Sequence, residues 1–106
     1  MQREENEIET KTCELALFQL RVRSLKLNVE GNTGWPDRLF FIPGGVPLFI
    51  EFKRPGEALR PRQELIRSFL HYNQYQIETH DTVEGALQAI KTAVDAAVRA
   101  GRCSAR

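Results

Sequence analysis

Apolar side chains recur every three or four residues in three stretches of the chain, which is the spacing of one face of a helix. The pattern predicts helices over Glu4–Leu20, over Gln63–Tyr72 and from Asp81 to about Ala100. Local signals agree with these limits. Acidic residues open the first stretch and complement the helix dipole, and Pro61 suits the first turn of the second. Asp81 and Glu84 have the spacing of a capping box at the start of the third.

Shorter stretches between these helices have the composition and alternation of strands. Leu25–Val29 alternates apolar and polar positions. The apolar run at Phe40–Ile42 and the run at Val46–Phe52 flank Pro43–Gly45, which is a turn signal, and together they predict a hairpin. Gln74–His80 alternates again, and because a helix separates it from the preceding strand we expect the two strands to be parallel.

The order helix, three strands, helix, strand, helix predicts an α/β fold in which helices flank a small mixed sheet. The chain of 106 residues is the size of one domain. We expect its core at about residues 5–90, with the end of the last helix and a basic tail in 91–106. The last helix is long for its few expected core contacts, so we expect its far end to pack on a second subunit. The expected core side of the second helix is Leu65, Ile66, Phe69 and Leu70.

Composition narrows the functions that the chain can have. Hydrophobic residues make up 42% and charged residues 27%, which is typical of a soluble protein, and no apolar run approaches the ~20 residues of a membrane span. The acidic, polar start is unlike a secretion signal, so a cytoplasmic location is expected. The net charge of +1 excludes a generally basic nucleic-acid coat. Cys13 and Cys103 are far apart and the sequence has no Cys/His cluster, so we expect no structural zinc site.

The predicted hairpin carries the chemistry. Glu51 and Lys53 are two positions apart on one strand, so their side chains point the same way, and a turn at Gly44-Gly45 brings Asp37 back beside Glu51. Charges at the end of an apolar sheet are costly to bury unless they pair or bind a metal. Two carboxylates and a backbone carbonyl suit Mg²⁺, and a lysine can orient a water or stabilise charge on a phosphate.

This combination resembles the PD-(D/E)xK signature, with Pro36-Asp37 followed by Glu51-Phe52-Lys53. The fuller string is similar to the VRR-Nuc family of restriction-endonuclease-like nucleases, which includes stand-alone phage and bacterial enzymes. The residues that carry the resemblance are Gly34, Pro36, Asp37, Arg38, Leu39, Pro43, Gly44, Gly45, Glu51, Phe52, Lys53, Gly56, Leu59, Pro61 and Gln63. The resemblance covers roughly residues 5–90 and implies a restriction-endonuclease-like core.

The resemblance also implies roles for individual residues. Asp37, Glu51, Lys53 and Gln63 would be catalytic, with Gln63 near the attacking water. The metal would be Mg²⁺, which Mn²⁺ can replace, held by Asp37, Glu51 and the Phe52 backbone carbonyl, either as one ion or as two. A glutamate of the first helix would be a further ligand. Helical periodicity favours Glu9 for it, while Glu5 and Glu7 stay close alternatives, Glu14 is less favoured, and all four could be solvated.

Four basic residues are candidates for DNA contacts, although such charges are more often a solvated face. They are Lys26, Arg38, Arg54 and Arg62. Trp35 is expected to pack on the core rather than to stack on a base.

The implied function is a metal-dependent endonuclease, and stand-alone members of the family resemble junction resolvases that act as homodimers. We therefore expect a homodimer that cuts branched DNA such as four-way junctions, in a bacterial or phage-infected cell, without a nucleotide cofactor or a membrane partner. The alternatives are a nuclease for flap or linear DNA and a non-catalytic nucleic-acid-binding module of the same fold.

Overall fold

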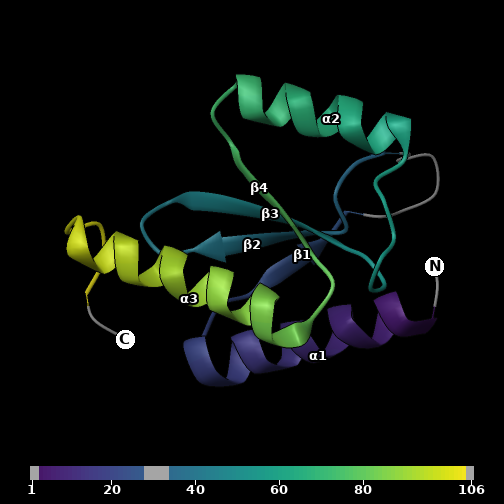
Figure 1. Ribbon diagram of the computed structural model, residues 1–106. Coiled ribbons are helices and arrows are strands. Elements are labelled where there is room, and N and C mark those ends of the chain that lie inside the picture. The colour runs from purple at the N-terminus through teal and green to yellow at the C-terminus, as the bar shows by residue number, and fades with distance from the viewer. Residues whose placement is uncertain (1–2, 28–33, 105–106) are drawn as a thin grey trace.

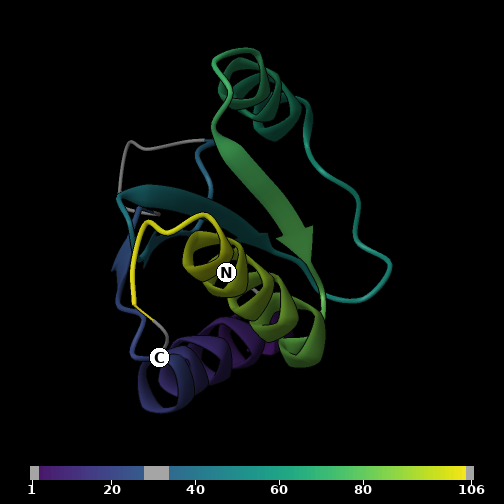
Figure 2. The ribbon, with the colours of Figure 1, turned by 90° about the vertical axis from the view of Figure 1, so that its left-hand side faces the viewer.

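The computed structural model describes residues 3–27 and 34–104. Within them, three helices pack on a four-stranded sheet, and the predicted α/β order is confirmed. The elements are α1 (Arg3–Leu20), β1 (Ser24–Lys26), β2 (Arg38–Ile42), β3 (Val46–Phe52), α2 (Pro61–Tyr72), β4 (Gln76–His80) and α3 (Val83–Arg99). Helices α1 and α3 cover one face of the sheet and α2 lies over the other (Figures 1 and 2). None of the described helices is both long and apolar enough to cross a membrane.

The predicted hairpin forms, and its register sets the positions of the site residues. Strands β2 and β3 are antiparallel, with Arg38 opposite Ile50 and Ile42 opposite Val46. The turn between them uses two glycines with positive φ, and a Cβ on Gly44 would lie 2.6 Å from the Cβ of Arg102. Strand β4 pairs with β3 in the parallel direction, as predicted from the helix between them.

The first strand differs from its prediction. It spans Ser24–Lys26, whereas we expected Leu25–Val29, the end of which lies outside the described residues. The expected buried side was also wrong at Leu25, which is 52% exposed. The reason is that β1 is the edge strand of the sheet. Within the described part of this segment, residues 21–27, the buried residue is Val22, which precedes the strand at the turn where Arg21 takes a positive φ.

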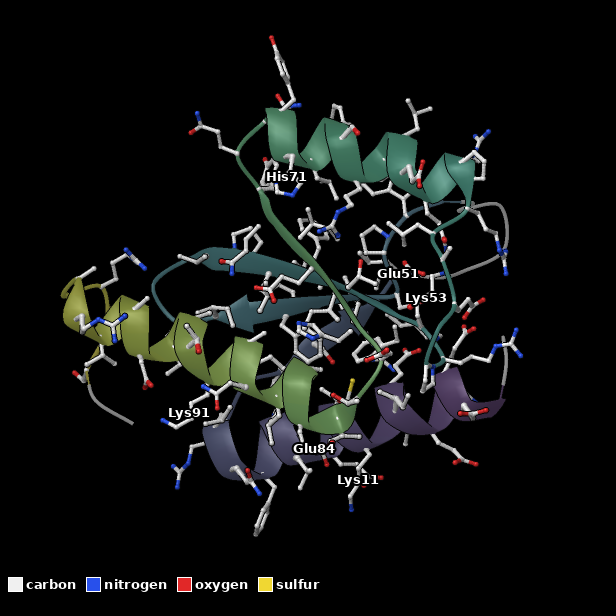
Figure 3. The ribbon with its side chains drawn as sticks, in the orientation of Figure 1. Lys11, Glu51, Lys53, His71, Glu84 and Lys91 are labelled. Carbon is white, nitrogen blue, oxygen red and sulfur yellow. The ribbon has the colours of Figure 1, made fainter. Side chains whose placement is uncertain are left out.

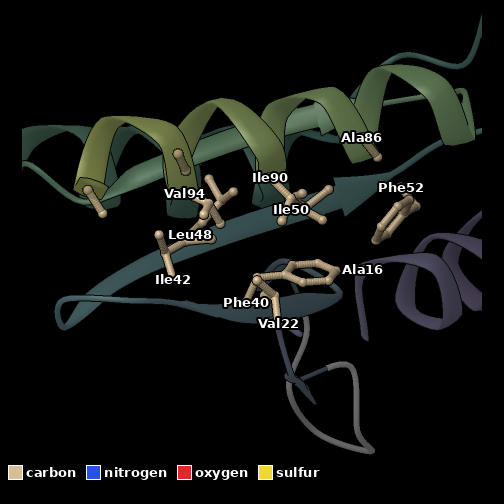
Figure 4. Packing of buried hydrophobic residues seen from close by; sticks show 12 residues of the cluster. Ala16, Val22, Phe40, Ile42, Leu48, Ile50, Phe52, Ala86, Ile90 and Val94 are labelled. Carbon is tan, nitrogen blue, oxygen red and sulfur yellow. The ribbon is translucent and has the colours of Figure 1, made fainter. Parts of the chain in front are cut away.

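The main core lies between the sheet and the layer of α1 and α3 (Figure 4). Its members are Ala16, Val22, Phe40, Ile42, Leu48, Ile50, Phe52, Ala86, Ile90, Ala93, Val94 and Ala97. Five of them come from α3 and follow helical spacing to its last turn. Our reason for placing a second subunit against the far end of α3 was therefore wrong, because that end is buried against the chain's own core. The helix also begins with Thr82 as its cap, not Asp81, and the Thr82 side chain accepts a hydrogen bond from Gly85 N.

Helix α2 contributes much less to the core than its sequence predicted. Only Leu70 is buried, whereas the expected core residues Leu65 and Phe69 are 67% and 52% exposed. Together with Tyr72, which is 87% exposed, they form an outer stripe on α2. The side of α2 that contacts the sheet instead carries polar residues, Gln63 and Arg67, which bond to side chains of the strands.

The packing of α3 gives a first testable prediction. Ile90 is fully buried, so Ile90→Ala should lower the free energy of unfolding by about 2–5 kcal/mol, through lost burial and the cavity left behind. Gln88→Ala, an exposed change two residues away, should alter it by no more than about 0.5 kcal/mol. Chemical denaturation of both variants measures the difference. Equal stability of the two would contradict the placement of α3 on the sheet.

Candidate active site

Two carboxylates meet across the hairpin at one end of the sheet. Asp37 immediately precedes β2 and Glu51 lies near the end of β3, and they are only 4% and 6% exposed. The backbone N–H of Phe52 donates to Asp37 Oδ2 at 2.7 Å, which fastens Asp37 to the neighbouring strand. The prediction that the hairpin brings these two acids together is therefore confirmed by the geometry.

A buried lysine completes this group. Lys53 follows the last residue of β3 and is 2% exposed, and its backbone N–H donates to His80 O at 2.9 Å, which continues the pairing with β4. Its Nζ lies 3.6 Å from Glu51 Oε2. Figure 3 shows Glu51 and Lys53 at the same end of the sheet, between α2 and the first turns of α1.

Gln63, in the first turn of α2, links the lysine to the acid. Its Nε2 donates to Glu51 Oε2 at 2.8 Å, and its Oε1 accepts from Lys53 Nζ at 2.7 Å. The same Oε1 accepts from Arg60 N at 2.9 Å and so caps the helix. One amide therefore fixes the start of α2 and the relative positions of Glu51 and Lys53. The sequence placed Gln63 facing the end of β3, and the structure agrees.

The pKa values of both acids are raised, which means that their ionised forms are unfavourable here without a further cation. Burial, and then repulsion by Asp37, raises the pKa of Glu51 from its ordinary 4.5 to about 8, although Lys53 acts in the opposite direction. Burial also raises the pKa of Asp37, against the hydrogen bond from Phe52 N. Taking two anions out of water with one partly shared ammonium is unfavourable. A divalent ion with oxygen ligands would relieve that cost, and the donors present fit Mg²⁺.

Glu9 is deeply buried, and its carboxylate forms ion pairs with two basic side chains. Its Oε2 accepts from Lys26 Nζ at 2.9 Å and from Arg38 Nε at 2.7 Å, while its Oε1 is buried without a hydrogen-bond partner among the described residues. This arrangement joins α1 to β1 and β2. Two of the four residues predicted to contact DNA, Lys26 and Arg38, therefore face Glu9 in this structure.

Glu5, one turn earlier on α1, also interacts with the hairpin group: Glu9 acts on the pKa of Asp37, whereas Glu5 acts on that of Glu51. It is 8% exposed, and burial raises its pKa to about 7, followed by a hydrogen bond to Glu57 and the charge of that residue. Lys53 and Asp37 also act on it, and Glu5 in turn raises the pKa of Glu51. Its Oε1 is buried without a hydrogen-bond partner among the described residues. The other two candidates, Glu7 and Glu14, are exposed.

Glu57 is a neighbour of the site that sequence reasoning missed. It lies in the connector between β3 and α2, where its carboxylate accepts from Arg54 N at 3.2 Å and lies 3.8 Å from Arg54 Nε. The turn residues around it predicted a loop but gave no sign that this loop returns to α1. Its pKa is lowered, chiefly by the hydrogen bond to Glu5, whereas the same contact raises the pKa of Glu5.

The remaining predicted residues lie around this group rather than in it. Arg54 and Arg62 are exposed. Trp35 is half-buried and packs edge-on against Phe69 of α2, with ring centres 6.2 Å apart. Over residues 3–27 and 34–104, no three His, Cys, Asp or Glu side chains come together as a ready-made metal cluster. The phosphate and metal roles of the predicted residues therefore stay predictions.

Comparison with known proteins identifies the fold. A solved structure titled "VRR_NUC domain" superposes with a TM-score of 0.71 at 22% sequence identity, over 83% of this chain and 95% of that one. Another, titled "VRR_NUC domain protein", gives 0.70 at 17% identity, over 90% of this chain and 91% of that one. No family model and no curated protein matches the sequence. At these identities the likeness shows the fold alone, and it confirms the fold that the sequence resemblance predicted.

The raised pKa of Glu51 predicts how the metal-free protein responds to pH. Its carboxyl group ionises near 4.5 in the unfolded chain and near 8 in the folded protein. The folded state therefore holds more protons between these values, and this contribution to stability is lost as the pH rises from about 4.5 to 8. Glu51→Gln removes the ionisation while keeping an oxygen that can accept from Gln63.

We expect the melting temperature of Glu51→Gln, relative to the unchanged protein, to increase between pH 5 and pH 8.5 in EDTA. Glu64→Gln, on the exposed side of α2, is the control and should show no such trend. Calorimetry at several pH values measures the difference. A constant offset between the Glu51 variant and the unchanged protein would contradict the raised pKa.

Proposed function

We propose that this protein is a metal-dependent endonuclease of the VRR-Nuc type that hydrolyses phosphodiester bonds in DNA. The observation that carries the proposal is the meeting of two buried carboxylates, a buried lysine and a glutamine at one end of the sheet. The likeness to VRR_NUC structures supports it, because it concerns the same fold around that group. A purely structural role would not require three ionisable groups to be buried side by side.

Mg²⁺, or Mn²⁺ in its place, would be held by Asp37, Glu51 and the Phe52 carbonyl. When bound, it would neutralise charge on the phosphoryl oxygen and lower the pKa of a bound water. Lys53 would hold the attacking water and stabilise negative charge on the phosphate. Gln63 would keep the Lys53 ammonium directed at this position, because its Oε1 accepts from Nζ while its Nε2 fixes Glu51.

We further propose that α1 contributes Glu5 to the metal site, in place of the Glu9 that helical periodicity favours. The charges of Asp37 and Lys53 act on Glu5 directly, and one of its oxygens is buried without a partner among the described residues. Glu9 already neutralises Lys26 and Arg38 at hydrogen-bond distance. Its role in this proposal is to fasten α1 to the sheet so that Glu5 is held near the hairpin acids.

The proposed substrate is branched DNA, such as a four-way junction, cut by a homodimer. One site of this kind cuts one strand, so two symmetric sites suit a junction in which two strands are nicked. The outer stripe of α2 supports a dimer, since Leu65, Phe69 and Tyr72 are spaced along one side of the helix and are each at least half exposed. Burial of this stripe against a second copy would also bring two sites into one assembly, because α2 carries Gln63.

Two other functions compete with this one. A nuclease for flap or linear duplex DNA would use the same residues and differ only in substrate. A binding module of the same fold would not cut, but the complete set of two acids, lysine and glutamine argues against it, since a site that no longer cuts has no need to keep the three ionisable groups buried and bonded.

Activity assays separate these functions. Lys53→Ala should reduce DNA cleavage in Mg²⁺ on the order of 10²–10⁴-fold, because the group that holds the water is lost. Lys91→Ala, an exposed change on α3, should leave cleavage unchanged. The substrates are labelled four-way junctions, flaps, splayed duplexes and linear duplexes, and circular dichroism checks that both variants are folded. Equal cleavage by the unchanged protein and Lys53→Ala would contradict the enzymatic role, and a preference for flaps or linear DNA would contradict only the junction.

Sedimentation and the cutting of junctions together test the dimer. The protein should sediment as a dimer at micromolar concentration, and Leu65→Glu should shift it to monomer and reduce paired cutting of junctions. Phe18→Glu, which alters a side chain 84% exposed on α1, is the matched control and should stay dimeric. A monomeric protein that ignores junctions would contradict the dimer and the substrate without affecting the catalytic group.

The two α1 glutamates should behave differently. Glu5→Gln should weaken Mn²⁺ binding about 10-fold or more, as expected when a group at a metal site is lost, without lowering the free energy of unfolding. Glu9→Gln should instead lower the free energy of unfolding by about 1–3 kcal/mol, because Lys26 and Arg38 lose a charged partner. Titration followed by electron paramagnetic resonance measures Mn²⁺ affinity, and denaturation measures stability. The reverse pattern would restore Glu9 as the ligand.

A further inference from the structure

Arg67 is a half-buried cation beside the site and takes no part in the proposed metal and water chemistry. It lies one turn after Gln63 on the side of α2 that contacts the sheet, and its Nη1 donates to Thr79 Oγ1 at 2.9 Å. Thr79 on β4 is the direct partner of Glu51 in the parallel pairing of β3 and β4. Partners in adjacent strands point to the same face and lie about 4.8 Å apart, so Thr79, to which Arg67 bonds, lies one strand spacing from Glu51.

The same group of residues borders a narrow, partly open cleft. Its lining includes Glu51, Gln63, Arg67 and Thr79. Gln63 and Arg67, which are four residues apart, therefore reach into one cleft from successive turns of α2. Gln63 bonds to the acid and the lysine, whereas Arg67 bonds to a neutral hydroxyl.

The hydrogen-bonding capacity of Arg67 is largely unused. A guanidinium has five N–H donors and no acceptor, and within residues 3–27 and 34–104 Arg67 makes one hydrogen bond and no ion pair. Lys26 and Arg38, by contrast, each form an ion pair with Glu9. A partly desolvated guanidinium beside a cleft, with free donors in a planar fork, matches the geometry of a phosphate.

We infer that Arg67 binds a phosphate group of the DNA strand at the mouth of this cleft, next to the phosphate that is cut. The inference rests on the proposed nuclease function and adds a substrate contact to it. Thr79 acts as a positioning residue, because its hydroxyl accepts the hydrogen bond that holds the guanidinium beside β4. A contact between Arg67 and a DNA phosphate would fix the direction in which the DNA backbone crosses the sheet. The phosphate that is cut would then lie over Glu51 and Lys53.

The test compares the binding of DNA by the unchanged protein and by Arg67→Met in EDTA, where no cleavage occurs. Fluorescence anisotropy of a labelled four-way junction and of a labelled duplex gives the dissociation constant over a series of salt concentrations. Loss of one phosphate contact should weaken binding of both DNAs about 10-fold and reduce the slope of log affinity against log salt by about 1. Arg99→Met makes the same charge change at the far end of α3 and should alter neither quantity.

Two further variants distinguish substrate contact from structural support. Arg67→Lys keeps the charge and should retain the salt slope while binding more weakly than Arg67, since it lacks the planar fork. Thr79→Val removes the partner of Arg67 and tests whether their hydrogen bond serves only to hold α2 on β4. In that case Thr79→Val and Arg67→Met would lower the melting temperature alike and leave the salt slope unchanged, which would overturn the inference.

Failure of this inference and failure of the nuclease proposal give different results. If the unchanged protein cuts DNA and Arg67→Met shows the same slope of log affinity against log salt as the unchanged protein, only the role of Arg67 is wrong. If Arg67→Met loses the contact and Mg²⁺-dependent cleavage falls with a raised KM, the inference is upheld. If the unchanged protein neither binds nor cuts any of the DNAs, the nuclease proposal is overturned and the role of Arg67 with it.

Discussion

The register between β2 and β3 is the constraint on which the rest of the structure depends. It places Arg38 opposite Ile50, so that Asp37 comes level with Glu51 and can accept the hydrogen bond from Phe52 N. A slip by one residue would turn Glu51 to the other face and bury Phe52 on the wrong side. The same alternation that sends Phe40, Leu48 and Ile50 into the core therefore also brings the acids together, and fold and site are specified by one pairing.

The burial of charge in that register explains how the remaining elements are arranged. Asp37, Glu51 and Lys53 are nearly inaccessible, and an unsatisfied charge in such a place is expensive. Helix α2 supplies Gln63, which bonds to Glu51 and Lys53. Because the side of α2 that contacts the sheet is therefore polar, its apolar residues face outward. Helix α1 supplies Glu9 to hold Lys26 and Arg38. Helix α1 thus neutralises two cations and α2 satisfies charged groups by hydrogen bonds, and the two hairpin acids still favour an added cation.

The sequence predicts the parts of this structure that depend on local spacing. The turn between two apolar runs predicts the hairpin, strand alternation predicts that Glu51 and Lys53 share a face, and Pro61 predicts that Gln63 lies in the first turn of α2. It predicts less well what depends on the distance between elements. Helical periodicity gives the side of α1 that faces the sheet, but it cannot tell whether the turn of Glu5 or that of Glu9 lies over the acids. Likewise, it cannot show that a polar side of α2 faces the sheet, so Leu65 was misplaced and the roles of Glu57 and Arg67 were missed.

The central claim is that the acids of this hairpin form a seat for a divalent cation. A crystal structure of the protein soaked in Mn²⁺, with anomalous diffraction recorded at the manganese edge, tests it most directly. The account predicts an anomalous peak within coordinating distance of Asp37, Glu51 and the Phe52 carbonyl. A well-diffracting, soaked crystal with no peak there, or with manganese bound only at other carboxylates, would contradict it.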